Sequence, residues 1–177
     1  MAAALLFLGG CKAGGKNENI NAGMEAVAAL EYDNALSSFA AARAAGEDLR
    51  RINRGEGIAY LGKSMYAEAA QALESALSYS DGRVSSMDYD INYYLATAYY
   101  KLGETGKAID VYNAILALKE GEKDAYYLRG AILAEQGSIE QAMEDFDTAI
   151  SLDKSDYDRL IDIYCVLAEH GYKETGL

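Results

Sequence analysis

Few residues of this chain could take part in covalent chemistry. Its 177 residues include one histidine, His170, and two cysteines, Cys11 and Cys165. Nucleophilic catalysis of the Ser/His/Asp or Cys/His kind needs a histidine beside the nucleophile, whereas His170 is expected in the last turn of a helix, where a cation is favourable. Cys165 stands in an apolar segment without a nearby Lys or Arg, so we expect a small core residue. The sequence therefore predicts neither enzyme activity nor a cofactor.

Metal and phosphate sites are not predicted either. The acidic stretch 153–158 carries three aspartates, but their spacing does not fit the loop that binds calcium in EF-hands. The glycines do not form the Gly-x4-Gly-Lys-Ser/Thr sequence of a phosphate-binding loop. We interpret these acids as helix-start residues, with Ser155 as a cap three positions before Asp158 and Ser86 as a cap before Asp88.

Small and large apolar residues recur with a period of 34 positions. Gly103 and Gly137 are 34 residues apart, and each is followed five residues later by an alanine and nine residues later by a large aromatic residue. Two earlier segments fit the same frame, with Ala35, Phe39, Ala69 and Leu73 in the equivalent places. A fixed period of this length marks an array of paired helices. We expect the alanines where two helices approach closely and the glycines in the left-handed turn between them.

The pattern resembles the tetratricopeptide repeat (TPR) family, whose repeat contains Trp-x2-Leu-Gly-x2-Tyr, a turn Gly, Ala-x3-Phe-x2-Ala and a closing Pro. The resemblance covers roughly residues 16–171, but the chain has no Trp or Pro, and Leu30 and Ser64 replace the turn glycine. It implies an all-α fold, a right-handed superhelical solenoid of antiparallel helix pairs with about four and a half repeats. The repeats would lie near 16–49, 50–88, 89–122 and 123–156, with a partial repeat at 157–177. The predicted helices span 17–29, 32–45, 49–62, 65–78, 86–102, 105–119, 122–136, 139–152 and 156–170.

In this family the first helix of each pair lines a concave groove. Carried over to this chain, the groove positions of that helix include Arg51, Arg54, Tyr93, Thr97, Tyr100, Lys101 and Tyr127. The resemblance thus implies a peptide-binding groove with a basic N-terminal end, an aromatic middle and an acidic C-terminal end. A bound peptide would place an acidic end near the arginine pair and stack on the tyrosines at 93, 100 and 127. Other tyrosines are expected in the repeat core, namely Tyr60, Tyr66, Tyr99 and Tyr112.

The N-terminus resembles a bacterial lipoprotein signal. Residues 2–8 are continuously apolar and lead into Leu8-Gly9-Gly10-Cys11, but seven residues cannot span a bilayer, which takes about 20. The resemblance implies that residues 1–11 are the signal, that Cys11 is acylated and that 12–16 form a flexible tether to the repeat array at 17–177. No Lys or Arg precedes Cys11, unlike the charged start of a signal peptide. We expect an extracytoplasmic, membrane-anchored lipoprotein; the alternative is a cytoplasmic adaptor whose N-terminus matches by accident.

The net charge of the chain and its C-terminal helix indicate which classes of partner the protein could bind. The net charge of −12 argues against nucleic acid and anionic membrane surfaces, because phosphate binding needs a face of Lys and Arg. The sequence therefore predicts a scaffold that binds a protein or peptide, with contact to the membrane only through the lipid. In the helix at 156–170 we expect Leu160, Ile163 and Leu167 to lack a covering helix. This leaves open a second function, self-assembly through the C-terminal helix as part of an envelope complex.

Overall fold

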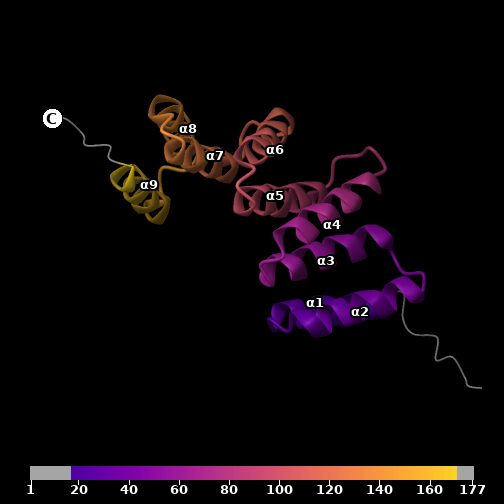
Figure 1. Cartoon of the computed structure of the whole chain (residues 1–177). Coiled ribbons are helices and arrows are strands. Elements are labelled where there is room, and N and C mark those ends of the chain that lie inside the picture. The colour runs from indigo at the N-terminus through magenta and orange to yellow at the C-terminus, as the bar shows by residue number, and fades with distance from the viewer. Residues whose placement is uncertain (1–16, 171–177) are drawn as a thin grey trace, which may run out of the picture.

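The computed structural model describes residues 17–170, which form nine helices and no strand (Figure 1). The predicted all-α solenoid of helix pairs is confirmed, and the helix ends agree with the predicted ranges to within one residue. None of the helices in this part of the chain is both long and apolar enough to span a membrane. Cys11 and the predicted tether lie outside the described residues. The helices are α1 (Glu18–Ala28), α2 (Tyr32–Ala44), α3 (Leu49–Gly62), α4 (Tyr66–Ser78), α5 (Ser86–Lys101), α6 (Thr105–Leu118), α7 (Lys123–Glu135), α8 (Ile139–Leu152) and α9 (Tyr157–Glu169).

Helices pack closely within each pair because small residues let their backbones approach. A Cβ atom added to Gly23 of α1 would lie 2.5 Å from Cε1 of Phe39 on α2, and one added to Gly130 of α7 would lie 2.8 Å from Cε1 of Phe146 on α8. Both phenylalanines are buried. Glycine is required at these positions because an aromatic ring of the partner helix rests on the backbone. The predicted close contacts are confirmed by complete burial of Ala35, Ala69, Ala108 and Ala142.

The turn inside each complete pair contains one residue in the left-handed conformation. Its φ angle is +79° at both Gly103 and Gly137, +61° at Leu30 and +59° at Ser64. In all four turns the amide of the next residue donates to a carbonyl five positions back, at 2.9 Å. Glycine favours this helix-terminating turn, and a residue with a side chain adopts it at a cost of about 1–2 kcal/mol. The two departures from the repeat pattern are therefore the strained turns of the array.

Two helices are capped by residues other than those predicted. Ser85, rather than Ser86, caps α5, and its amide and hydroxyl donate to the aspartate three residues on at 2.8 and 2.6 Å. Asp156, rather than Ser155, caps α9, and its Oδ1 accepts from the amide of Arg159 at 3.0 Å. The cap is in each case the residue directly before the first helical turn, because only from there can a short side chain reach the free amides.

One face of α9 is covered, which corrects two expectations. Ile163 and Leu167 are only 4% and 6% exposed and lie in a core cluster with residues of α7 and α8, so they have a cover. Cys165 is exposed rather than in the core, because it lies about 200° around the helix from Ile163. Ile161 and Tyr164 point the other way, and each is 60% exposed.

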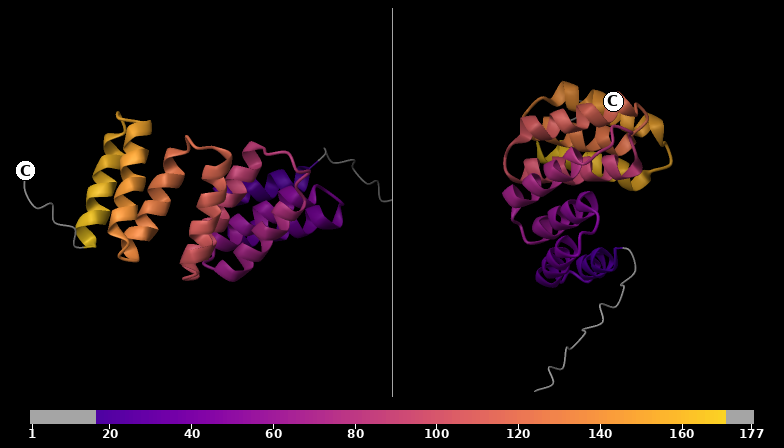
Figure 2. Two further views of the ribbon diagram at one scale, coloured as in Figure 1. Left: turned by 90° about the horizontal axis from the view of Figure 1, so that it is seen from above. Right: turned by 90° about the vertical axis from the view of Figure 1, so that its right-hand side faces the viewer.

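The helix pairs follow one another in chain order (Figure 2). Among the first helices of the pairs, α1 contacts α3, α3 contacts α5, and α7 contacts α9, whereas the Cα atoms of the second helices of successive pairs do not approach within 8 Å. The first helices therefore lie on the concave side. One junction differs from the others, because no Cα atoms of α5 and α7 approach within 8 Å. At this junction the two pairs are joined through α6 and α7 instead.

Candidate functional site on the concave face

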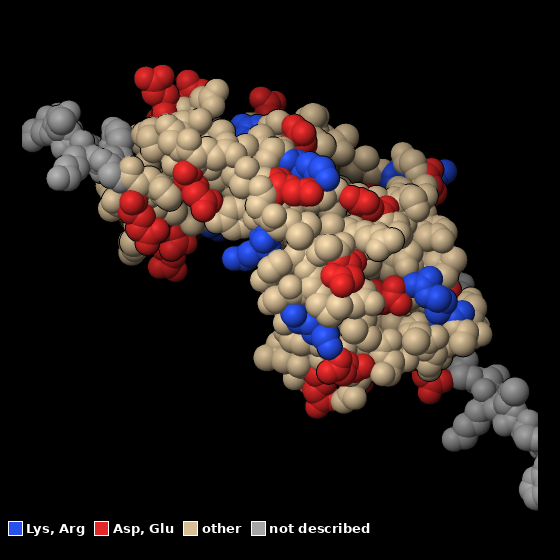
Figure 3. Space-filling view, viewed as in Figure 1, with Lys and Arg blue, Asp and Glu red and all other residues tan. Residues whose placement is uncertain are grey.

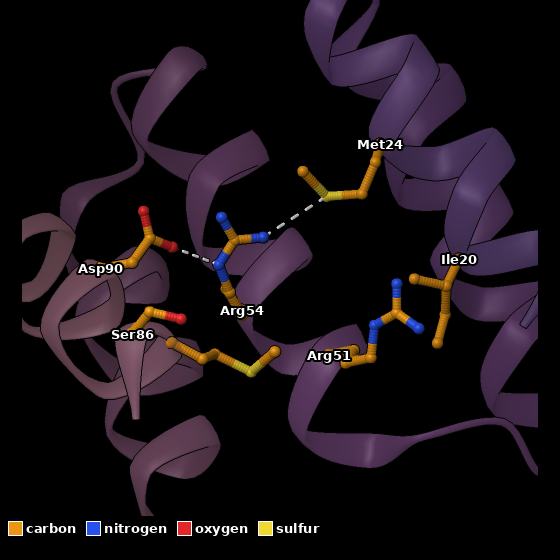
Figure 4. A pocket seen from close by; sticks show the side chains of 7 residues that line it. Ile20, Met24, Arg51, Arg54, Ser86 and Asp90 are labelled. Carbon is orange, nitrogen blue, oxygen red and sulfur yellow. Dashed lines mark hydrogen bonds and ion pairs between the residues drawn. The ribbon is translucent and has the colours of Figure 1, made fainter. Parts of the chain in front are cut away.

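Five of the seven predicted groove residues fall into two separate pockets on the concave side. The first, which we call the N-terminal pocket, has a volume of about 450 Å³ and receives side chains from α1, α3 and α5 (Figure 4). Both predicted arginines lie in it. Its lining residues are Ile20, Met24, Arg51, Arg54, Ser86, Met87 and Asp90.

The two arginines of the N-terminal pocket differ in their availability. Arg54 Nε donates to Asp90 Oδ2, and its Nη1 lies 4.0 Å from the sulfur of Met24 (Figure 4). Arg51 lies beside Ile20, and within residues 17–170 it forms no ion pair. Because Asp90 neutralises the charge of Arg54, Arg51 is the arginine that can supply the predicted basic end of the groove.

The second pocket lies at the junction where α5 and α7 separate, and we call it the α5–α7 cleft. Its volume is about 480 Å³, and the first helices of three successive repeats contribute to it. Three predicted residues of α5 meet here. Glu135 and Glu169 form an acidic side of the cleft, which agrees with the acidic C-terminal end that the family resemblance implies. The lining residues are Thr97, Tyr100, Lys101, Tyr112, Leu128, Ala131, Ile132, Glu135, Val166, Glu169 and His170.

Tyr93 and Tyr127 lie in neither pocket, because other side chains of the array hold them. The hydroxyl of Tyr93 donates to Glu122 at 3.1 Å, and its ring centroid is 6.1 Å from that of Tyr112. Burial and the hydrogen bond to Glu122 raise the pKa of Tyr93. The ring of Tyr127 lies 6.1 Å from that of Phe146, and the guanidinium of Arg159 covers it at 4.1 Å. Both rings therefore support the packing between repeats, and their contribution to binding stays a prediction.

Several residues that line the cleft were not predicted for the groove, and the most informative of them is Tyr112. It was placed in the core, and the structure confirms its burial at 3% exposure, yet it also lines the cleft. A signal was present in the sequence. The equivalent positions of the other repeats are Phe39, Leu73 and Phe146, so only this repeat places a hydroxyl group where a dry core has no use for one.

The surface of the molecule is acidic toward the C-terminal end. Nine Asp and Glu face two Lys and Arg between Ile139 and His170, and Figure 3 shows acidic side chains gathered over this end of the molecule. Within the described residues, no group of three or more His, Cys, Asp or Glu is arranged to hold a metal ion. The two pockets and the acidic C-terminal end are suited to recognition of a ligand by its shape and charge.

Comparison with known proteins gives the same architecture. Among curated proteins, the chain is 26% identical over 134 residues to the TPR repeat-containing protein MJ1428 of Methanocaldococcus jannaschii, covering 75% of this chain and 22% of that protein. It is 25% identical over 145 residues to the BBSome complex member BBS4 of Xenopus tropicalis, covering 82% of this chain and 27% of that protein. The chain thus spans about a quarter of the length of these relatives.

Solved structures resemble the chain over most of its length. A tetratricopeptide repeat protein from Parabacteroides merdae superimposes with a TM-score of 0.72 at 23% identity, covering 88% of this chain and 59% of that one. YrrB, described as a TPR protein with an unusual peptide-binding site, superimposes with a TM-score of 0.66 at 24% identity, covering 88% and 78%. These similarities establish the fold. The profile of the tetratricopeptide repeat family matches residues 54–123 and again 93–158. The chain belongs to the tetratricopeptide repeat family.

Proposed function

We propose that this protein is a scaffold without catalytic activity that binds a segment of another protein along its concave face. The observation that carries the proposal is the α5–α7 cleft, where side chains from α5, α7 and α9 converge on one hollow. The N-terminal pocket, with Arg51, extends the recessed surface to the first repeats. A rigid array of repeats offers such a surface without an ordering cost on binding.

A second candidate function is self-assembly through the C-terminal helix. Its support is an apolar groove of about 380 Å³ between α8 and α9, beside the exposed Tyr164. Exposed apolar surface of this kind favours association. The groove is lined by Met143, Phe146, Asp147, Ile150, Leu160, Ile163, Tyr164, Leu167 and Ala168.

One crosslinking experiment separates the two functions. A photoreactive amino acid is placed at Thr97 in the cleft, at Tyr164 on α9, or at Ala114 on α6 as a matched exposed control. If the concave face binds a partner, position 97 gives a heterologous adduct in cells and position 114 does not. A ladder of homo-oligomers from position 164 alone would favour self-assembly. Adducts of equal yield from all three positions would contradict both functions.

We further propose that the protein acts outside the cytoplasm, anchored by a lipid on Cys11. The support is the order of an apolar segment, the sequence Leu-Gly-Gly-Cys and a Gly-rich polar stretch. Stable anchoring takes more than one acyl chain, which acylation of a lipoprotein cysteine supplies.

We expect that Cys11→Ala abolishes incorporation of a radiolabelled fatty acid and releases the protein from the membrane fraction of a bacterial host. The reason is that the thiol is the acceptor of the lipid. Cys165→Ala is the matched control and should retain both properties. Fatty-acid labelling that survives Cys11→Ala, or a parent protein found wholly in the soluble fraction, would favour the cytoplasmic alternative.

A further inference from the structure

The α5–α7 cleft exists because one junction of the array is open. Cα atoms of the first helices approach within 8 Å at the junctions α1–α3, α3–α5 and α7–α9, whereas α5 and α7 meet through side chains alone. Bulky rings stand at the open junction, where Tyr93 of α5 leans on Tyr112 of α6 with their planes tilted by 57°. The two rings belong to an apolar cluster that also includes residues of α7. The gap exposes part of the second-helix residue Tyr112 to the concave side, so that it lines the cleft.

Tyr112 brings a hydroxyl group without a protein partner to this cleft. The residue is 3% exposed, and its hydroxyl has no hydrogen bond within residues 17–170. Burial raises the pKa of Tyr112 to about 12, so the hydroxyl stays neutral and can both donate and accept. The hydroxyl is not a fully buried atom, because the buried unpaired side-chain nitrogen and oxygen atoms of residues 17–170 are Nε of Arg50 and Nε of Arg159. It therefore opens onto the cleft. A ligand group in the cleft would provide that partner.

The charges around the cleft favour a cation as that group. The cleft receives carboxylates from Glu135 and Glu169, and a hydrogen bond to Glu135 raises the pKa of Tyr100 beside it. Lys101 also lines the cleft, with Nζ 5.5 Å from the ring centroid of Tyr100, and His170 follows the end of α9. The walls are apolar and come from the leucine, alanine, isoleucine and valine at positions 128, 131, 132 and 166. A fitting side chain is long and apolar along its stem and cationic at its tip.

We propose that the α5–α7 cleft is an arginine-binding site, which takes the side chain of an arginine in the protein segment bound on the concave face. The methylene stem lies between the apolar walls, and the guanidinium pairs with Glu135 and Glu169. One further guanidinium N–H donates to the Tyr112 hydroxyl. Arginine satisfies this set better than lysine, because its five N–H donors are fixed in a planar fork and can serve several acceptors at once. This inference rests on the proposed function and adds to it the class of partner segment.

The test uses the full chain and four acetylated, amidated peptides. The sequence Ser-Ala-Ala-X-Ala-Ala-Ser carries arginine, lysine, norleucine or glutamate at X. Binding is followed by NMR titration of backbone amides. We expect the arginine peptide to bind at least about tenfold more tightly than the norleucine peptide, which corresponds to one charge-assisted hydrogen-bonded pair. The largest shifts should map to the wall residues 128, 131 and 166.

Variants identify the groups responsible. Tyr112→Phe should weaken the arginine peptide about three- to tenfold without lowering the melting temperature, because the hydroxyl has no partner in the free protein. Tyr99→Phe is the matched control, since its hydroxyl bonds Glu74 outside the cleft, and it should not change affinity. Glu135→Gln with Glu169→Gln should remove the preference for arginine over norleucine, while Glu140→Gln on α8 should leave it intact.

The outcomes distinguish this inference from the proposed function. Equal affinity for the arginine and norleucine peptides, or equal effects of Tyr112→Phe and Tyr99→Phe, would overturn the arginine site. Shifts confined to the N-terminal pocket around Arg51 would also overturn it, while leaving binding on the concave face supported. The proposed function itself would fail only if position 97 also gave no heterologous crosslink.

Discussion

Gly55→Leu should destabilise the array by about 3 kcal/mol, at the upper end of the range for overpacked cores. A Cβ atom at this position of α3 would meet the ring of Phe39 on α2, and that ring is fully buried. The ring cannot move away, because Gly23 of α1 packs against its other side, where an added Cβ would lie 2.5 Å from Cε1. Chemical denaturation followed by circular dichroism would measure the loss.

A matched glycine serves as the control for this prediction. Gly106 also lies in a helix, α6, but an added Cβ atom there would have no neighbour within 4 Å. Gly106→Ala should therefore raise stability by up to about 1 kcal/mol through helix propensity. Gly55→Leu combined with Phe39→Ala should recover part of the loss, because removal of the ring makes room. If Gly55→Leu unfolds at the same denaturant concentration as the parent, the packing of the first two pairs is not as described.

Arg129→Met should cost about 3–5 kcal/mol, which is typical when a buried ion pair loses one partner. Asp145 on α8 is 5% exposed. Arg129 on α7 serves both of its oxygens, with Nε 2.8 Å from Oδ2 and Nη2 2.6 Å from Oδ1. The same guanidinium donates to Asn113 on α6 at 2.6 Å. The substitution would leave a buried carboxylate without a counter-charge and would remove a link between the third and fourth repeats.

The double variant Arg129→Met with Asp145→Leu tests the cause. It replaces the pair with apolar side chains of similar size and should restore most of the stability, because the desolvated charge is gone. Urea titrations of the parent and the two variants give the comparison. If Arg129→Met alone were as stable as the double variant, the Asp145 carboxylate would be hydrated without its arginine. That result would contradict the buried ion pair.

The fold could be predicted from sequence because its determinants are local and periodic. The small residues at 34-residue intervals fix which faces of two helices meet, and the turn residues follow from the same frame even where Leu30 and Ser64 replace glycine. Neither assignment depends on contacts between distant repeats. For this reason even the first repeat, which departs most from the family pattern, has helix ends within one residue of those predicted.

The site was predicted less completely because it depends on contacts between repeats. The pairing of Arg54 with Asp90 joins residues 36 positions apart, and no local pattern shows which side chains will reach across. Tyr93 and Tyr127 occupy equivalent positions, and each ring packs against an aromatic ring of the second helix of its pair. The α5–α7 cleft is lined by residues of three successive repeats, so no single repeat reveals it.

The open junction also has a mechanical consequence. In a stack of repeats, bending of the whole array is resisted at each interface between neighbouring pairs. The array therefore bends most easily at the interface with the fewest contacts. Between α5 and α7 the concave side has no backbone contact to resist bending, and the restraint comes from α6 and α7 together with the three-helix link through Arg129. We expect changes in curvature to concentrate there, so that two stiff arms turn about one joint. A ligand seated at that joint would set the angle between the arms.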